Sequence, residues 1–426
     1  MRLMTLVCAM ATAATPSEAA IIGHMAPPPS LTVGRLSALP ASTRVAWRKY
    51  IARSSSAMAH DKAALAIERK GLLTVPAPPP EGGAATMPLG RDPAWYAADA
   101  ARAVADNIVS FQTPTGGWGK NQDRNAPPRV QGQMYLPFDS KAGAYAKADL
   151  AGGWSFVGTL DNDATTTELS FLARVQASRP GAAGERYRAA FVKGIRYLLQ
   201  AELLGGGWPQ VYPLQGGYHD ALTLNDDTMI KATALFQRTA AGTGEFAFVP
   251  VPMRMKARQA ATRAIATLLA TQLIVQGRRT IWAQQYDPLT RAPVGARNFE
   301  PIALATGESG AVLRFLMKQP DPTPAMRRAI TDGATWFATH GIRDVVWTAS
   351  KGAEGRRLVR QPGAGPTWAR FYDAATQKPI FGDRDRSIQD DVNAISLERR
   401  NGYSWFGTAG TGVASDYAKW MRLHGG

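Results

Sequence analysis

Two acidic loops, each directly before a predicted helix, are the strongest chemical feature of the sequence. Residues 160–165 read Leu-Asp-Asn-Asp-Ala-Thr, and residues 224–228 read Leu-Asn-Asp-Asp-Thr. One aspartate in each loop is expected as an N-cap, because its carboxylate accepts an unpaired backbone N–H of the helix. Three acidic or amide side chains exceed that need, and Ca²⁺ prefers a shell of about six to eight hard oxygen ligands. The loops indicate either surface caps, the simpler interpretation, or a calcium site without EF-hand spacing.

Basic and aromatic residues gather later in the chain, in segments 282–287, 295–300, 368–373 and 381–386, and the last three of these contain arginine. The planar guanidinium pairs bidentately with carboxylates, which suits recognition of uronic acids. Several of these arginines stand beside Asp or Glu, so a structural ion pair explains any single one equally well. The five histidines show no metal-ligand spacing, and no H-E-x-x-H, G-x-S-x-G or P-loop is present.

The chain carries a formal net charge of +16. Such an excess indicates an anionic partner, which could be a polyuronate, a nucleic acid or a membrane surface, although a general solubility charge explains it too. Acids in a cleft for a polyanion would repel it unless a divalent cation bridges the carboxylates of protein and substrate. A cation on a uronate carboxylate would also acidify the adjacent C5–H, as a Lewis acid does.

Residues 1–20 have the pattern of a secretory signal peptide. They contain Arg2, an apolar run over 6–14 and a small-residue cleavage site at 17–19. The apolar run is shorter than the roughly 20 residues that span a bilayer, so we expect a secreted protein, periplasmic or extracellular, without a membrane anchor. The only cysteine, Cys8, lies in this leader, so the mature protein would contain no disulfide.

Two regions follow the leader. Residues 21–90 mix proline clusters at 27–29 and 76–80 with one helical stretch over 42–71. This pattern predicts an arm whose helix either packs on the main domain or swings free. The catalytic domain is expected to span 91–426.

The main domain is predicted to be all-α. Apolar residues recur at helical spacing, strand-like alternation is sparse, and helices of this number must pack on helices. The expected helices span 93–112, 164–178, 184–201, 227–239, 252–272, 300–318, 322–342 and 414–423.

A weak internal repeat refines this fold. Segments 112–118 and 200–208 each run from a helix end through glycines to a tryptophan, Trp118 and Trp208. Recurring hairpins of this kind fit an α/α toroid, and each tryptophan is expected as a core residue beneath its turn.

Taken together, these motifs resemble the family 10 polysaccharide lyases, which are pectate lyases. The resemblance covers residues 93 to 420. The segments that carry it are Gly-Gly-Trp-Gly-Lys-Asn at 116–121, Thr-Leu-Asp-Asn-Asp-Ala-Thr at 159–165, Gly-Gly-Trp-Pro-Gln at 206–210, Leu-Asn-Asp-Asp at 224–227, Trp-Ala-Gln-Gln-Tyr at 282–286 and Arg-Arg-Asn-Gly-Tyr at 399–403.

The resemblance implies an (α/α)₃ toroid that binds polygalacturonate across a central cleft with Ca²⁺. Matched by motif, Asp161 and Asp226 resemble the calcium-binding acids, and Asn162 lies beside them as a substrate-binding residue. Arg297 is similar in position to the arginine taken as the Brønsted base.

Three further residues match substrate-binding positions of the family. Arg370 and Arg384 resemble arginines that hold substrate carboxylates, with Arg386 an alternative to Arg384, and Lys120 is matched by its motif alone. The implied reaction is β-elimination, in which Arg297 removes the C5 proton and a 4,5-unsaturated sugar forms. Arginine is protonated at ordinary pH, so a cationic cleft that favours its neutral form and an alkaline optimum are both expected.

Three other functions remain compatible with the residues. An inverting glycoside hydrolase could use Asp161 and Asp226 as its two carboxylates, and a non-catalytic protein could stack aromatic faces on sugars. Nucleic-acid binding has only the charge in its favour, since no known motif for it is present. We expect a monomer that acts on polygalacturonate, with no nucleic-acid or membrane partner.

Overall fold

The structure is a computed structural model that describes residues 20–137, 154, 156–349 and 352–424. The predicted leader, with Cys8, lies outside these residues apart from Ala20. The described α-helices are α1 Ala41–Arg69, α2 Asp99–Ser110, α4 Thr166–Ser178, α5 Glu185–Ala201, α6 Thr228–Ala241, α7 Val251–Thr271, α8 Thr306–Met317, α9 Pro324–Thr339, α10 Leu397–Gly402 and α11 Ala409–His424.

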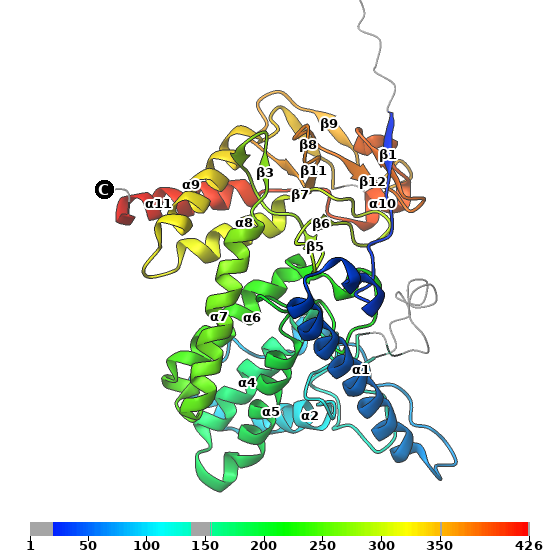
Figure 1. The fold of residues 1–426 in the computed structure, drawn as a ribbon, viewed down its shortest axis with the longest axis vertical. Helices are drawn as coiled ribbons and strands as arrows, with labels where there is room; N and C mark the ends of the chain where they lie inside the picture. The colour runs from blue at the N-terminus through cyan, green and yellow to red at the C-terminus, as the bar shows by residue number, and fades with distance from the viewer. Residues whose placement is uncertain (1–19, 138–153, 155, 350–351, 425–426) are drawn as a thin grey trace, which may run out of the picture.

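The helices form an (α/α)₃ toroid, which confirms the predicted all-α class. Inner helices α4, α6 and α8 contact one another in sequence, and outer helices α5, α7 and α9 do the same around them. Figure 1 shows α2, α4 and α5 at one end of the molecule and α9 and α11 at the other. The predicted helix over 300–318 begins later, at Thr306, because residues 304–305 form a strand instead.

Short strands join the helices, and none that the structure describes exceeds four residues. They are β1 Ile21–His24, β2 Leu222–Thr223, β3 Ile274–Val275, β4 Arg278–Arg279, β5 Gln285–Tyr286, β6 Pro293–Val294, β7 Leu304–Ala305, β8 Val345–Trp347, β9 Leu358–Arg360, β10 Trp368–Ala369, β11 Phe371–Tyr372, β12 Phe381–Gly382, β13 Ser387–Gln389 and β14 Phe406–Gly407. All their named pairings are antiparallel. They connect the loops at one end of the inner helices.

Four buried tryptophans repeat one local structure. Each follows a helix and donates its indole N–H to a carbonyl of that helix, at 2.7, 2.8, 2.7 and 3.0 Å. They are Trp118 after α2, Trp208 after α5, Trp282 after α7 and Trp368 after α9. The predicted core role of the first two is confirmed, and the repeat extends to four units rather than two.

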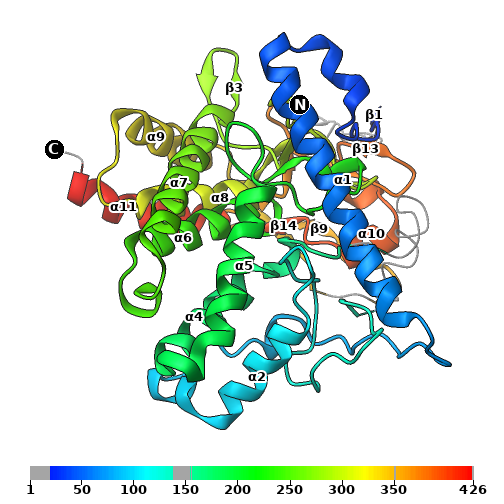
Figure 2. The ribbon, with the colours of Figure 1, turned by 60° about the horizontal axis from the view of Figure 1, so that its bottom comes forward.

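The predicted arm packs on the toroid. One face of α1 is buried, from Trp47 to Leu65, and α1 runs along one side of the body in both ribbon views (Figures 1 and 2). Tyr50 donates to the carbonyl of Ala201 at 2.9 Å. Asp61 is fully buried and accepts from the backbone N–H and the hydroxyl of Thr115, at 2.8 and 2.6 Å. The helix thus contacts the turn that precedes Trp118.

Replacing Asp61 with alanine is expected to lower the free energy of unfolding by about 1–3 kcal/mol, because the two donors of Thr115 lose their acceptor in a buried place. The shift of the urea midpoint measures this. Asp61→Asn keeps one acceptor oxygen and should cost less. An unchanged midpoint in the alanine variant would show that α1 does not support this turn.

No described helix is long and apolar enough to cross a membrane.

Candidate active site

The two acidic loops form matching 3₁₀ turns, Asp161–Asp163 before α4 and Asn225–Asp227 before α6. The predicted aspartate caps are wrong: no side chain caps α4 or α6. At α4 the N-cap position is Thr165, so neither aspartate of the first loop occupies it. At α6 the N-cap is Asp227, whose φ of +60° is left-handed rather than extended, and its side chain makes no capping hydrogen bond. Because α4 and α6 are neighbouring inner helices, the two turns meet.

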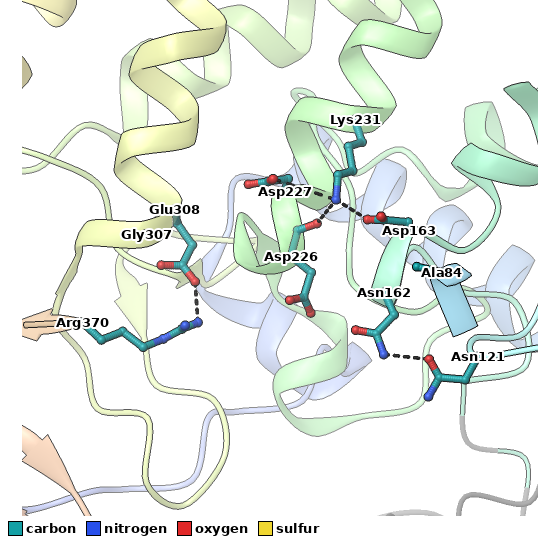
Figure 3. A pocket seen from close by; sticks show the side chains of 10 residues that line it. All are labelled: Ala84, Asn121, Asn162, Asp163, Asp226, Asp227, Lys231, Gly307, Glu308 and Arg370. Carbon is teal, nitrogen blue, oxygen red and sulfur yellow. Dashed lines mark hydrogen bonds and ion pairs between the residues drawn. The ribbon is translucent and has the colours of Figure 1, made fainter. Parts of the chain in front are cut away.

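Two adjoining cavities lie at this meeting point and share Asn162 and Asp226 as lining residues. The smaller has a volume of about 200 Å³, and its charged lining residues are Lys120, Asp161, Asp226, Arg297 and Glu300. The larger has a volume of about 530 Å³, and its charged lining residues are Asp163, Asp226, Asp227, Lys231, Glu308 and Arg370 (Figure 3). The structure thus brings together six of the seven predicted site residues.

Asp161 and Asp226 interact directly. Asp161 accepts from Lys120 and from Gln210, both at 3.0 Å, and Asp226 accepts from Asn225 at 2.8 Å. Burial works to raise the pKa of Asp161, but Lys120 and a hydrogen bond with Asp226 outweigh it and hold the pKa at about 2. Burial and the Asp161 carboxylate raise the pKa of Asp226 to about 8. The two carboxylates therefore lie close together and shift each other's pKa in opposite directions, an arrangement that a cation between them would relieve.

Lys120 is held from two sides. Its ammonium contacts the Asp161 carboxylate and lies 3.6 Å from the ring centroid of Phe156. The cation–π contact and the ion pair fix a flexible side chain at the wall of the smaller cavity.

Arg297 belongs to a buried cluster with Glu300 and Tyr403. Glu300 accepts from Nε of Arg297 at 2.9 Å, from one Nη at 2.5 Å and from the Tyr403 hydroxyl at 2.6 Å. Burial disfavours the charged guanidinium, but Glu300 outweighs it and raises the pKa of Arg297 well above its ordinary value. The expectation that the cleft favours neutral Arg297 is therefore wrong, because a carboxylate and not a cation is its nearest neighbour.

Arg370 lines the larger cavity, between β10 and β11. It donates to Glu308 at 2.7 Å and to the side chain of Asn225 at 3.3 Å, so it spans from the first turn of α8 to the second acidic loop. Its pKa is raised, because Glu308 outweighs the effect of burial.

Arg384 is the one predicted residue that lines neither cavity. Its guanidinium donates twice to Glu398, both at 3.0 Å, and lies 4.9 Å from the ring centroid of Phe299. The ring of Phe299 also lies under Arg297, at 4.8 Å. Arg384 thus lies on the outer side of the Arg297 cluster. Arg386 is exposed, and its carbonyl accepts from Met25.

Sequence reasoning missed several residues of the site, although one signal could have found some of them. The residue two positions after each repeat tryptophan lines one of the two cavities. These residues are Lys120, Gln210, Gln284 and Arg370. Glu308 and Tyr403 were missed because their partners lie far away in sequence. Glu300 and Lys231 were missed although Arg297 and Asp227 stand three and four residues from them.

The lining charges do not balance. Six carboxylates face four cations, a formal excess of two negative charges when all are ionised. Each cation has its own carboxylate: Lys120 pairs with Asp161, Lys231 with Asp163, Arg297 with Glu300 and Arg370 with Glu308. Asp226 and Asp227 carry the remaining charge. One divalent cation would neutralise the lining.

Comparisons with known proteins agree with this arrangement. The profile of the pectic acid lyase family matches residues 112–414. A family 10 polysaccharide lyase from Cellvibrio cellulosa is 30% identical with a TM-score of 0.64, over 79% of this chain and 97% of that chain. An aspartate-to-alanine mutant of a family 10 polysaccharide lyase from the same organism, in complex with trigalacturonic acid, is 31% identical with the same TM-score, over 77% and 95%.

No match emerged among curated proteins. The family profile covers well over half of the chain, and both solved structures share its fold along nearly their whole length. The resemblance drawn from the motifs is confirmed. The chain belongs to the pectic acid lyase family, the family 10 polysaccharide lyases, and is a lyase that acts on polysaccharides.

Proposed function

We propose that this protein is a secreted pectate lyase that cleaves α-1,4-linked polygalacturonate by calcium-assisted β-elimination. The observation that carries the proposal is the convergence of Asp161, Asp226, Arg297 and Arg370 on two adjoining cavities. A relative of the same family was solved with trigalacturonic acid, which supports the substrate. The leader pattern in residues 1–20 supports export.

The residues present fit Ca²⁺. Asp161 and Asp226 are adjacent carboxylates in the lining of the smaller cavity, and the amide oxygen of Asn162 is a further hard donor at the same cavity. Among the residues that the structure describes, no group of three or more His, Cys, Asp or Glu side chains is arranged to hold a metal. Two carboxylates leave most of the shell to water and substrate. When bound, Ca²⁺ supplies charge that neutralises the uronate carboxylate and acidifies the C5–H.

The chain's own side chains supply the remaining steps of this proposal. Arg370 and Lys120 hold uronate carboxylates at the two cavities, and the fixed pair with Glu300 orients Arg297 toward the smaller one. Arg297 removes the C5 proton, the electron pair of that C–H bond forms the C4=C5 double bond, and the C4–O bond breaks. The glycosidic oxygen takes up a proton and becomes a new hydroxyl. No water is consumed.

A hydrolase mechanism is disfavoured by the same geometry. An inverting hydrolase separates its two carboxyl groups by about 6.5–9.5 Å to admit a water molecule. Asp161 and Asp226 are close enough to share a hydrogen bond, which leaves no room for that water.

The decisive experiment follows ultraviolet absorbance of unsaturated uronides while the purified protein acts on polygalacturonate, with Ca²⁺ and then with excess chelator. We expect a rise that the chelator abolishes and that added Ca²⁺ restores. Reducing ends that increase without absorbance would establish hydrolysis. Binding of polygalacturonate without either signal would identify a glycan-binding protein.

A further inference from the structure

The ammonium of Lys231 occupies a position among three oxygen atoms in the lining of the larger cavity (Figure 3). It donates to the carboxylate of Asp163 and, at 3.0 Å, to the backbone carbonyl of Asp226. The carboxylate of Asp227 lies 3.9 Å away. Lys231 comes from the second turn of α6, whereas Asp163 belongs to the turn before α4, so the contact joins the two acidic loops.

The two acids around Lys231 are an unfavourable feature in a cleft for a polyanion. Neither caps a helix, and both hold a left-handed backbone conformation that costs about 1 kcal/mol or more for a non-glycine residue. Their carboxylates face the same cavity as Arg370, where substrate carboxylates are expected under the proposed function. Without a counter-charge they would repel a uronate.

We propose that Lys231 is a built-in counter-ion of the substrate cleft. It neutralises Asp163 and offsets part of the repulsion from Asp227, and thereby lets the uronate residue next to the one held at Asp161 and Asp226 lie along α6. The inference rests on the proposed function for its substrate. It adds a substrate-positioning residue to the reaction, since Lys231 acts through the charge of two neighbouring side chains.

The three oxygen atoms around Lys231 suit the ammonium of a lysine as counter-ion. A lysine is a compact point charge with three donors, and two of them bind oxygens of different loops here. The same three oxygens would suit a divalent cation if the ammonium were absent. Lys231 therefore also keeps a second cation away from the cleft.

Lys231→Met is the first test, because methionine preserves length and removes charge at a side chain that is one-third exposed. We expect KM for polygalacturonate at low salt to rise about tenfold, which is the size expected for the loss of one close charge pair. The change in kcat should be much smaller. The rise should shrink in about 0.5 M NaCl, because salt screens repulsion between charges that water reaches. Lys231→Arg retains the charge and should stay within about threefold of the native KM.

The double variant Asp163→Asn with Lys231→Met removes one acid together with the cation. It should bring KM back toward the native value, because the charge balance of the cavity is restored. Calcium titration by calorimetry gives a readout apart from activity. Lys231→Met should bind a second Ca²⁺ that the double variant does not bind.

The outcomes separate this inference from the proposed function. A Lys231→Met variant with native KM at low salt overturns the counter-ion role. A defect that salt leaves unchanged and that Asp163→Asn deepens shows that Lys231 only joins the loops, and overturns it too. Native protein that neither binds nor cleaves polygalacturonate contradicts the proposed function itself.

Discussion

Replacing Arg297 by lysine is expected to lower kcat on polygalacturonate by about 10³-fold, the scale of a lost general base, with little change in KM. Lysine has one nitrogen and cannot hold the two-point contact with Glu300 while presenting a second nitrogen to the cavity. In Arg297, Nε and one Nη are bound to Glu300, which leaves the other Nη for the substrate. Initial rates of unsaturated product over a range of substrate concentrations measure the change.

Arg263→Lys is the matched control. Arg263 makes the same two-point contact with Glu202, at 2.8 and 2.6 Å, on the outer helix α7. Its replacement should leave kcat and KM unchanged, so an equal loss in both variants would mean that the effect on Arg297 is only structural.

The pH profile tests the role of Arg297 as base. The folded-state pKa of Arg297 is raised by Glu300, so its neutral form is scarce at neutral pH and kcat should rise with pH into the alkaline range. Glu300→Gln removes the charge that favours the guanidinium, and the pKa of Arg297 should fall. The rising limb should then move to lower pH. The other groups that face Arg297, namely Asp161, Tyr218, Arg370 and Tyr403, stay in place.

If the rising part of the kcat–pH profile stays at the same pH in Glu300→Gln, the ionisation that it reports belongs to a group other than Arg297. In that case Arg297 acts as a fixed cation, and the loss in Arg297→Lys reflects the missing donor rather than a missing base.

Replacing Asp226 by asparagine is expected to lower activity at moderate Ca²⁺ by more than about 10²-fold, since a lost metal ligand removes both affinity and charge. Asp226 lines both cavities, and burial together with the neighbouring Asp161 carboxylate raises its pKa. Asparagine keeps the shape and the hydrogen bond from Asn225 but cannot supply the negative charge. Calcium titration by calorimetry should show lost or strongly weakened binding.

Asp416→Asn serves as the control for loss of one aspartate. Asp416 pairs with Arg314 on the surface, and its replacement should change neither calcium binding nor rate. If Asp226→Asn bound calcium with native affinity, Asp226 would not be a ligand of the proposed metal site. Asp227 would then carry the excess negative charge of the lining.

The sequence by itself determined the inner and outer helices, two of the four tryptophan units and the residues at the centre of the site. Apolar periodicity and helix-ending glycines act over a few residues, so the inner and outer helices were predictable from local order. The acidic loops were visible for the same reason, because two acids beside an amide in so short a stretch exceed the needs of capping. The tryptophan repeat was predicted only at Trp118 and Trp208. The structure adds Trp282 and Trp368, and thereby puts Lys120 and Arg370 at equivalent positions.

Only the tertiary structure decided which charges meet. Lys231 reaches Asp163 across 68 residues, and Arg370 reaches Glu308 across 62. These pairs depend on how the inner helices and the strand-linked loops pack, and no pattern within one segment encodes that packing. The same limit explains why Arg384 lines neither cavity, since its guanidinium pairs with Glu398, which is 14 residues away in sequence. Coulomb attraction acts between groups close in space, so the ion pairs of the site could be identified only after the toroid had brought them together.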